Sequence, residues 1–418
     1  MNGLRAYPVY LGIKGASALF FMLWATVASV YRIEEVGLDP LRLVLLGTAL
    51  EVAILVCEVP TGVLADTYGR RRSVITGFVL IGSGFVLEGA VPTFAAVLVA
   101  QAVWGVGYTF ISGALEAWIA DEAPERELGR VYLRGEQADY AGSLLGVILS
   151  VLFAAYALNL PLLIGGFLTI GLGLALFFAM PERNFRPSPR EGRSSLQQVR
   201  ATAGGGVRLV RARPVLLILL AVAVFTGMSQ EGFDRLYPMH FLDGLGLPSL
   251  GALDPVVWFG IINAGALILS YLAAEVVGRR LNVGDAAVAA RLLLVLNACT
   301  IVGMLLFALA GSFAFALAAF WFASLARTLA EPLYLTWLNE GLDPKVRATV
   351  ISMGSQAGAF GEASAGPVIG ALGNLAGVRT ALTAASLILS PALLLYAHAI
   401  GHRGRPVLED EPIPDKRA

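Results

Sequence analysis

Long runs of apolar residues alternate with short polar connections along almost the whole chain. A helix needs about 20 apolar residues to cross the hydrocarbon core of a bilayer. Runs of that length lie near residues 10–31, 41–62, 73–90, 93–118, 135–157, 160–180, 214–241, 254–277, 286–310, 312–338, 348–373 and 376–400. The pattern predicts an all-α membrane protein with twelve transmembrane helices.

The basic residues predict which way this chain is inserted. With both termini placed in the cytoplasm, the inner segments hold 25 of the 30 Lys and Arg residues, and the outer loops hold only Arg32, Arg42 and Arg379. Cytoplasmic loops of membrane proteins carry such an excess of Lys and Arg. We therefore expect a multi-pass protein of the cell inner (plasma) membrane with both termini cytoplasmic.

The longest polar segment, residues 181–213, contains eight arginines and follows the sixth apolar run. It predicts a cytoplasmic linker between a bundle at residues 1–180 and a bundle at 214–400, with a cytoplasmic tail at 401–418. The halves repeat when shifted by 219 residues, which aligns Trp118, Asp121, Gly135 and Gln137 with Trp337, Glu340, Gly354 and Gln356. Parallel repeats of this kind predict two pseudo-symmetric six-helix bundles with a substrate site between them.

Composition narrows the class of protein further. The chain is 57% hydrophobic and 14% charged, whereas a soluble domain carries about 25% charge. Its formal net charge of zero gives no reason to expect a nucleic acid partner. Cys57 and Cys299 lie inside apolar runs without a second metal ligand nearby, and no phosphate-binding loop occurs, so we expect no metal, no cofactor and no enzyme activity.

A polar turn at residues 61–72 separates the second and third apolar runs. It contains Gly62, Asp66, Gly69 and Arg70, in which the glycines favour a tight helix end and the arginine can pair with a carboxylate. This spacing resembles the cytoplasmic loop signature of the major facilitator superfamily, a group of twelve-helix secondary transporters. The resemblance implies the major facilitator fold and transport of a small molecule by alternating access.

The same resemblance implies a gating latch on the cytoplasmic side. Asp66 would face the start of the eleventh span near residues 346–350, and Arg70 would pair with Asp121 or Glu116. A worn copy of the signature appears after a shift of 209 residues, where Glu275 and Arg279 align with Asp66 and Arg70.

The fourth span is similar to that of the superfamily's drug:proton antiporters, which carry an arginine followed by two glycines. Gly105 and Gly107 keep the glycines, but Gln101 stands at the arginine position. The resemblance therefore implies a drug-exporter-like branch whose usual proton-relay arginine is missing.

Ionisable and amide side chains inside the spans predict the site of function, because such groups are costly in a bilayer. Glu231 with Arg235, and Arg327 with Glu331, are four residues apart and could form pairs on one helix face. Asp234 then lacks a partner, and residues 230–235 become the leading coupling site. The complete set of candidate proton and substrate residues is Glu51, Gln101, Asp139, Gln230, Glu231, Asp234, Arg235, Arg327 and Glu331; Glu88, at the outer end of the third span, is expected to be solvated.

Three functions fit these observations. The first is a monomeric, proton-coupled exporter of lipophilic or cationic organic compounds, of the multidrug type, in which buried carboxyl groups carry the protons. The second is transport of a small anionic metabolite or inorganic anion, with Arg235 and Arg327 as clamps. The third is a membrane scaffold or lipid scramblase that transports no solute.

Overall fold

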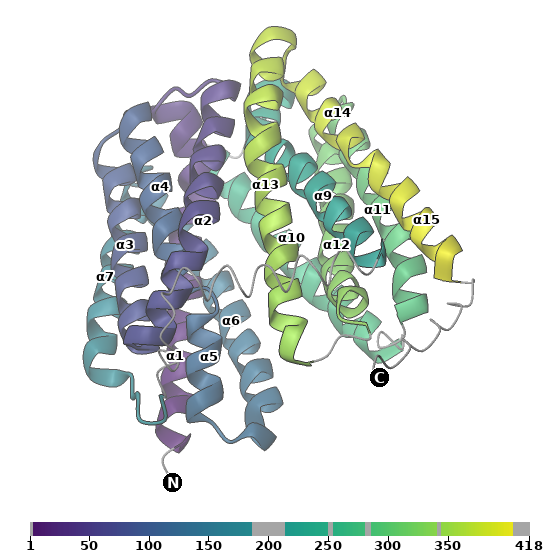
Figure 1. Ribbon diagram of the computed structural model, residues 1–418. Coiled ribbons are helices and arrows are strands. Elements are labelled where there is room, and N and C mark those ends of the chain that lie inside the picture. Colours follow the sequence, from purple (N-terminus) through teal and green to yellow (C-terminus); the bar gives the residue numbers. More distant parts are fainter. Residues whose placement is uncertain (1–2, 186–213, 250–253, 281–285, 341–343, 404–418) are drawn as a thin grey trace, which may run out of the picture.

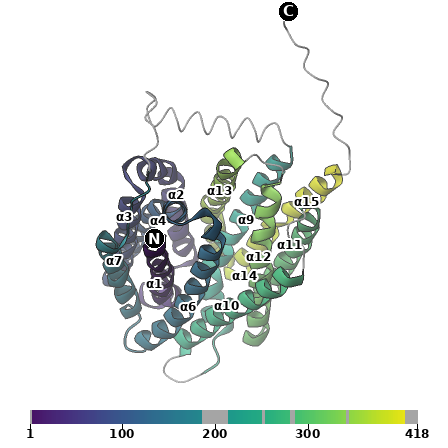
Figure 2. The same ribbon diagram turned by 90° about the horizontal axis from the view of Figure 1, so that it is seen from below.

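The structure, a computed structural model, describes residues 3–185, 214–249, 254–280, 286–340 and 344–403. Every regular element in these ranges is a helix, as the apolar pattern predicts. The helices form two bundles that lie side by side (Figures 1 and 2).

The first bundle contains the helices before the linker. They are α1 (Gly3–Val30), η1 (Tyr31–Glu35), α2 (Pro40–Tyr68), α3 (Arg70–Ala90), α4 (Phe94–Ile111), α5 (Ala114–Glu122), η2 (Glu125–Glu127), α6 (Leu128–Ala154) and α7 (Leu160–Ala179). Gly113, with φ of +72°, separates α4 from α5 inside one apolar segment. A positive φ is the conformation that glycine adopts more readily than other residues.

The second bundle contains the remaining helices. They are α9 (Pro214–Met239), η3 (His240–Leu245), α10 (Asp254–Arg280), α11 (Ala286–Ala308), α12 (Phe313–Leu338), α13 (Pro344–Ala376), α14 (Val378–Ile388) and α15 (Ser390–Arg403). Trp118 of the first bundle and Trp337 of the second, which the sequence repeat aligns, are both buried in the cores of their bundles. The two tryptophans therefore occupy equivalent positions in the two bundles, as the internal repeat predicts.

Eleven helical segments in the described ranges are long and apolar enough to cross a membrane. Four of these segments are composite: α1 joins η1 in Ala6–Glu35, α4 joins α5 in Phe94–Glu122, α9 joins η3 in Pro214–Leu245, and α14 joins α15 within Val378–Gly401. Helix α13 has 33 residues but is not in this set, and it is rich in glycine, alanine and serine. Twelve spans are therefore not established by length and composition.

Glycines allow the closest helix contacts within each bundle. In the first bundle, a Cβ added to Gly142 of α6 would collide with the backbone of Gly15 of α1. In the second, a Cβ on Gly361 of α13 would collide with the carbonyl of Val224 of α9. Small residues let helix backbones approach in membranes, and Gly142 and Gly361 have this packing role here.

The two bundles meet mainly where α13 packs against α2 (Figure 1). Gly370 approaches Leu41 and Gly373 approaches Pro40, where an added Cβ would lie 2.9 and 2.7 Å from the nearest atom. Beyond them, the side chain of Asn374 accepts a hydrogen bond from the Leu41 amide at 3.0 Å and donates one to Asp39 at 3.2 Å. These contacts hold the start of α2 against the end of α13.

Candidate functional site

A cavity of about 1000 Å³ lies between the two bundles. Its walls come from α2 and α4 on one side and from α9, α11, α12 and α13 on the other, with contributions from α15. Toward the side of the N-terminus the lining continues to Ser112 after α4, Leu338 at the end of α12 and Ile351 in the early turns of α13; we call this the open end. The opposite limit, at Glu51, Tyr237 and Glu362, is the closed end, beyond which α2 and α13 pack together.

The charged residues that line the cavity in the described part of the chain are mostly acids. They are Glu51, Glu58, Asp234, Glu331 and Glu362, with Arg327 as the single cation. Aromatic rings of Trp104, Tyr108, Tyr237, Phe320, Tyr334 and Tyr396 share the same walls. The cavity therefore combines negative charge with apolar and aromatic surface.

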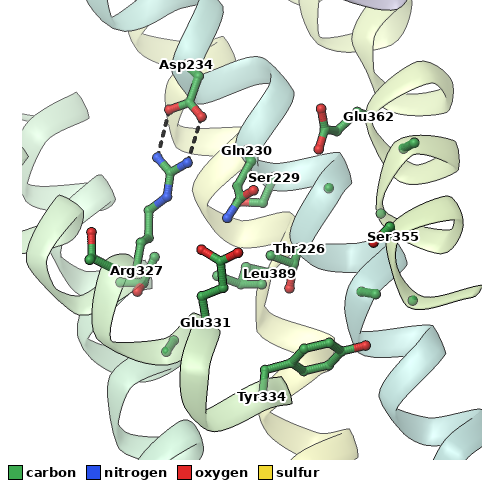
Figure 3. A pocket seen from close by; sticks show the side chains of 18 of the residues that line it. Thr226, Ser229, Gln230, Asp234, Arg327, Glu331, Tyr334, Ser355, Glu362 and Leu389 are labelled. Carbon is green, nitrogen blue, oxygen red and sulfur yellow. Dashed lines mark hydrogen bonds and ion pairs between the residues drawn. The ribbon is translucent and has the colours of Figure 1, made fainter. Parts of the chain in front are cut away.

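Arg327 of α12 binds Asp234 of α9 through two parallel hydrogen bonds (Figure 3). The Nη1–Oδ1 distance is 2.7 Å and the Nη2–Oδ2 distance is 2.6 Å. Bidentate geometry of this kind is the strongest form of a guanidinium–carboxylate contact. The expectation that Arg327 pairs with Glu331 is wrong, because a neighbouring helix supplies a better placed acid than the next turn does.

The carboxyl group of Glu331 points into the cavity toward Gln230 (Figure 3). Glu331 is exposed to the cavity, and it makes no ion pair with any residue in the described ranges. Gln230 and Asp234 also line the cavity, so three of the polar residues predicted for this site lie together.

Glu231 and Arg235 form the ion pair that their spacing predicts, with 3.2 Å between Arg235 Nε and Glu231 Oε1. Neither residue lines the cavity. They face α2 instead, where a Cβ on Gly47 would collide with both side chains. The two cations proposed as anion clamps, Arg235 and Arg327, are therefore both engaged by acids.

Glu51 of α2 is buried, with 9% of its surface exposed. Glu362 of α13 lines the same end of the cavity. About two turns closer to the open end, Glu58 of α2 accepts a hydrogen bond from Gln356 of α13. Glu362 is a site residue that was not among the predicted candidates, although an acidic residue inside an apolar run is a signal that could have identified it.

Two further predicted site residues, besides Glu231 and Arg235, lie away from the cavity. Asp139 of α6 pairs with Lys14 of α1 at 3.5 Å, beside a 3.0 Å pair between Lys14 and Glu136. Gln101 of α4 is buried and donates a hydrogen bond to Glu88 Oε2 at 3.1 Å. Neither position lines the cavity.

The expectation that Glu88 is solvated is wrong. Its side chain is completely buried, and it binds Arg32 at 2.7 and 3.1 Å and accepts a hydrogen bond from the Trp24 indole at 3.2 Å. Arg32 lies in η1, which continues α1, and its guanidinium group contacts Glu88 of α3.

The polar turn at residues 61–72 is a helix hairpin, in which Gly69 alone separates α2 from α3. Gly69 has φ of +113°, and a Cβ there would lie 2.8 Å from Glu182 Oε2. Helix α2 runs on to Tyr68, and nothing lies within 4 Å of a Cβ placed on Gly62. The helix end predicted at Gly62 is therefore wrong, and Gly69 makes the turn.

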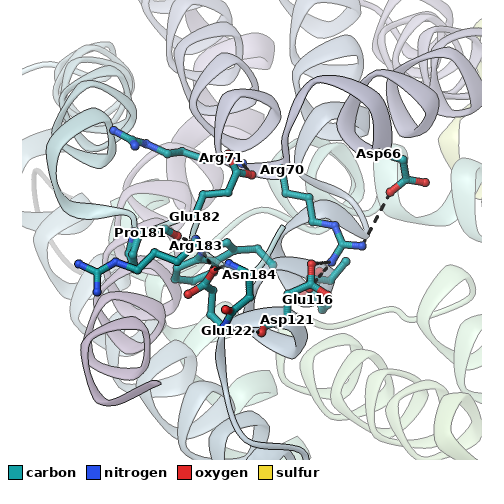
Figure 4. A network of polar contacts seen from close by, with 12 residues as sticks. Asp66, Arg70, Arg71, Glu116, Asp121, Glu122, Pro181, Glu182, Arg183 and Asn184 are labelled. Atoms are coloured by element: carbon teal, nitrogen blue, oxygen red, sulfur yellow. Dashed lines mark hydrogen bonds and ion pairs between the residues drawn. The ribbon is translucent and has the colours of Figure 1, made fainter. Parts of the chain in front are cut away.

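Arg70 forms its ion pair with Asp121 and not with Glu116 (Figure 4). The Nη1–Oδ2 distance is 2.5 Å, the same nitrogen binds the carbonyl of Ala117, and Asp66 lies 3.9 Å from Nη2. All of these residues belong to the first bundle, so the described contacts form no latch between bundles. The predicted contact of Asp66 with residues 346–350 falls largely outside the described side chains.

The second-half copy of this signature lies in α10. Glu275 is exposed near the end of that helix. The side chain of Arg279 lies outside the described residues. Within the described ranges, no group of His, Cys, Asp or Glu residues could hold a metal ion.

Comparison with known protein families gives a match over most of the chain. A family model described as Major Facilitator Superfamily matches residues 10–365. Among curated proteins, the uncharacterized MFS-type transporter YxaM of Bacillus subtilis (strain 168) is 22% identical over 395 residues, which are 91% of this chain and 92% of that protein.

Solved structures share the fold at low sequence identity. The nucleoside transporter NupG (D323A mutant) superposes with a TM-score of 0.72 at 14% identity, covering 95% of this chain and 100% of that one. A bacterial homolog of the human lysosomal transporter Spinster, in an inward-facing and unoccupied conformation, gives 0.71 at 15% identity over 96% and 97% of the two chains. At these identities the likeness establishes the arrangement of helices and nothing about the substrate.

Proposed function

Because this chain belongs to the major facilitator superfamily of secondary transporters, we propose that it exports lipophilic organic cations in exchange for protons, by alternating access. The observation that carries this proposal is the charge of the central cavity, where five carboxyl groups face one arginine in the described part of the chain. Aromatic rings on the same walls suit a bulky cation, by apolar contact and by attraction to the ring faces.

Glu331 is the residue that would bind the positive charge of the substrate. Its carboxyl group faces the cavity, and the other acid on that wall, Asp234, is engaged by Arg327. The anion-transport alternative would need Arg235 or Arg327 to release its acid before a substrate could bind. The neutralised arginines therefore favour a cationic substrate.

The membrane topology that goes with this function has α13 as a further span, the eleventh in chain order, which brings the number of spans to twelve. A helix rises about 1.5 Å per residue, so its 33 residues exceed the length needed for a hydrocarbon core of about 30 Å. Its glycines Gly361, Gly366 and Gly370 face α9 or α2 rather than lipid. We place both termini in the cytoplasm and the protein in the cell inner membrane as a monomer, with bundles at 1–180 and 214–400, the linker at 181–213 and the tail at 401–418.

In this orientation the structure is open to the cytoplasm. The gating residues Gly62, Asp66, Gly69, Arg70, Asp121 and Glu116, with Glu275 and Arg279 of the second bundle, would then meet across the bundles when the cytoplasmic side closes. The pairing of Arg70 with Asp121 inside one bundle supports a rigid surface on which such a contact can form.

The test is uptake of tetraphenylphosphonium, a lipophilic cation, into liposomes containing the purified protein and an imposed proton gradient. Wild-type protein should drive gradient-dependent accumulation that an uncoupler abolishes. Glu331→Gln keeps the shape but removes the charge, and should lower the apparent affinity for the cation at least about tenfold, the equivalent of about 1.4 kcal/mol. Glu127→Gln, an exposed acid on η2 far from the cavity, is the matched control and should transport normally.

Other results would point to the alternatives. Gradient-driven uptake of benzoate that is lost in Arg327→Lys, with no flux of tetraphenylphosphonium, would support the anion transporter. Transfer of labelled lipid between the leaflets without flux of either solute would support a scramblase.

A further inference from the structure

The buried carboxylate of Glu88, near the end of α3, is the centre of a polar network inside the first bundle. An ionised carboxylate has about four acceptor sites, and four donors reach this one, two from Arg32 and one each from Trp24 and Gln101. The hydroxyl group of Tyr31 also donates to the backbone carbonyl of Glu88 at 3.0 Å. A polar network that is fully satisfied holds its members rigidly.

The network fixes the ring of Trp24. Its indole N–H donates to Glu88 at 3.2 Å, and the guanidinium carbon of Arg32 lies 5.1 Å from the centre of its ring. The same ring stacks on Phe85 of α3, with the centroids 4.6 Å apart and the planes 6° from parallel. Trp24 is buried, with 4% of its surface exposed, so these contacts determine its orientation.

Trp104 of α4 connects this arrangement to the cavity. Its ring meets that of Trp24 edge to face, with the centroids 4.8 Å apart, and it also packs against Phe85 at 6.0 Å and Phe21 at 5.9 Å. Of these four rings only Trp104 lines the cavity, where it is partly exposed. Edge-to-face contacts favour particular ring orientations. The indole that the first bundle presents to the cavity is therefore oriented by its contact with Trp24.

We propose that the Arg32–Glu88 pair positions the indole of Trp104 at the cavity wall, where the ring receives an aromatic group of the substrate. The pair acts through Trp24 and does not itself line the cavity. Trp104 belongs to the first bundle and Glu331 to the second, so a cation with aromatic rings is bound from both bundles, by its charge and by a ring. Aromatic cations are then preferred to aliphatic cations of the same charge. This inference rests on the proposed export of organic cations and names the subclass of cation.

The first experiment compares tetraphenylphosphonium with tetrabutylphosphonium, which has the same charge and no aromatic ring. Affinities for the purified protein are measured by isothermal titration calorimetry. Trp104→Leu should lower the affinity for tetraphenylphosphonium about fivefold, the size of one aromatic contact, and leave that for tetrabutylphosphonium nearly unchanged. The ion pair is removed as a unit, by Arg32→Gln with Glu88→Gln, because either change alone would bury an uncompensated charge. This pair variant should change the two affinities in the same way as Trp104→Leu.

Two controls separate positioning from a general loss of structure. Adding Trp104→Leu to the pair variant should cause no further loss of affinity, because both changes remove the same contact. Glu122→Gln removes another buried acid of the first bundle, at the end of α5, and should keep the preference for the aromatic cation. Equal losses for both cations in the pair variant, or losses that add when Trp104→Leu is included, would overturn the proposal.

A second measurement needs no substrate. The chain has six tryptophans, and protein containing 5-fluorotryptophan gives fluorine NMR signals from them; the signal of Trp104 is the one lost in Trp104→Leu. The pair variant should broaden or split this signal, because the ring then takes several orientations. The signals of Trp118 and Trp337, which lie in other clusters, should not change. A Trp104 signal that is the same with and without the ion pair would contradict the proposal.

Together the measurements separate this inference from the proposed function. A Trp104 signal that depends on the ion pair, in a protein that does not transport tetraphenylphosphonium, supports the positioning of the ring and rejects the proposed substrate. Proton-driven transport of tetraphenylphosphonium, with a Trp104 signal and a cation preference that do not depend on the pair, supports the exporter and rejects the positioning.

Discussion

Arg327 shows how far residue spacing alone can identify an ion pair. Two acids compete for it, Glu331 on the next turn of its own helix and Asp234 on α9, and the spacing of four residues favours the first. The structure selects the second, because the guanidinium of Arg327 meets the carboxylate of Asp234 edge to edge with both hydrogen bonds formed. A bidentate ion pair between two helices is more stable than a single contact between neighbouring turns of one helix.

The pair predicts opposite effects for single and double substitutions. Asp234→Asn leaves the guanidinium of Arg327 without its carboxylate and should lower the free energy of unfolding by on the order of 1 kcal/mol, a small value because the side chains are 44% and 21% exposed. It should also weaken binding of a cation, since an unneutralised positive charge then faces the cavity. Adding Arg327→Gln should restore much of both properties, measured by thermal unfolding in detergent and by tetraphenylphosphonium binding. Equal losses in the single and double variants would contradict this account.

Glu88 and Arg32 mark the limit of prediction at this scale. The depth of each residue along its own apolar run suggested that both were solvated or in loops. The structure buries them together, because η1 extends α1 beyond the predicted span and brings Arg32 against the end of α3. Depth along one helix cannot show what a neighbouring helix covers, whereas Glu231 and Arg235 were predictable because both partners lie on the same helix.

At the scale of elements, the start of the linker is the least expected feature. Residues 181–184 were assigned to a cytoplasmic linker, yet they are bound to the first bundle (Figure 4). The carboxylate of Glu182 accepts a hydrogen bond from the amide of Arg71, in the first turn of α3, at 2.9 Å. Buried Glu122 of α5 accepts from the amides of Arg183 and Asn184 at 2.7 and 2.8 Å. A proline-containing, charged segment gives no sequence signal for such contacts.

Glu182 therefore acts as a cap for α3, supplying a negative charge where the helix has unpaired amides. Glu182→Ala should lower stability by about 1 kcal/mol, the usual cost of losing a cap. Glu182→Gln keeps an acceptor and should lose less. Thermal unfolding of the purified variants, compared with Glu127→Gln on the exposed η2, measures both effects, and an unchanged transition in Glu182→Ala would contradict the capping role.

Most elements themselves were predictable, because each apolar run is long enough to form a helix across a bilayer. Their interruptions were not. Helix α2 passes Gly62 and ends only at Tyr68, before Gly69, while Gly113 breaks the fourth run between α4 and α5. A helix tolerates glycine unless a neighbouring group or a turn requires positive φ, and that requirement depends on tertiary contacts.

At the scale of the whole molecule, the repeat of 219 residues predicted two similar bundles, and the buried Trp118 and Trp337 agree with it. The side on which the cavity opens could not be predicted. Conformations of an alternating transporter differ by only about a few kcal/mol, and the same contacts within each bundle serve all of them. The sequence therefore predicts the two bundles better than it predicts their relative tilt.

The orientation and the open side predict together which cysteines a membrane-impermeant maleimide can reach. In a protein without Cys57 and Cys299, Ser355→Cys at the lining of the cavity should react in inside-out vesicles and stay protected in right-side-out ones. Val91→Cys, exposed in the turn after α3, should show the reverse pattern, because an odd number of bilayer crossings separates it from the N-terminus. Excess tetraphenylphosphonium should slow only the reaction at Ser355→Cys, since the cation occupies that cavity. If Ser355→Cys reacted from outside and Val91→Cys from inside, both termini would lie outside the cell, and the proposed direction of export would be reversed.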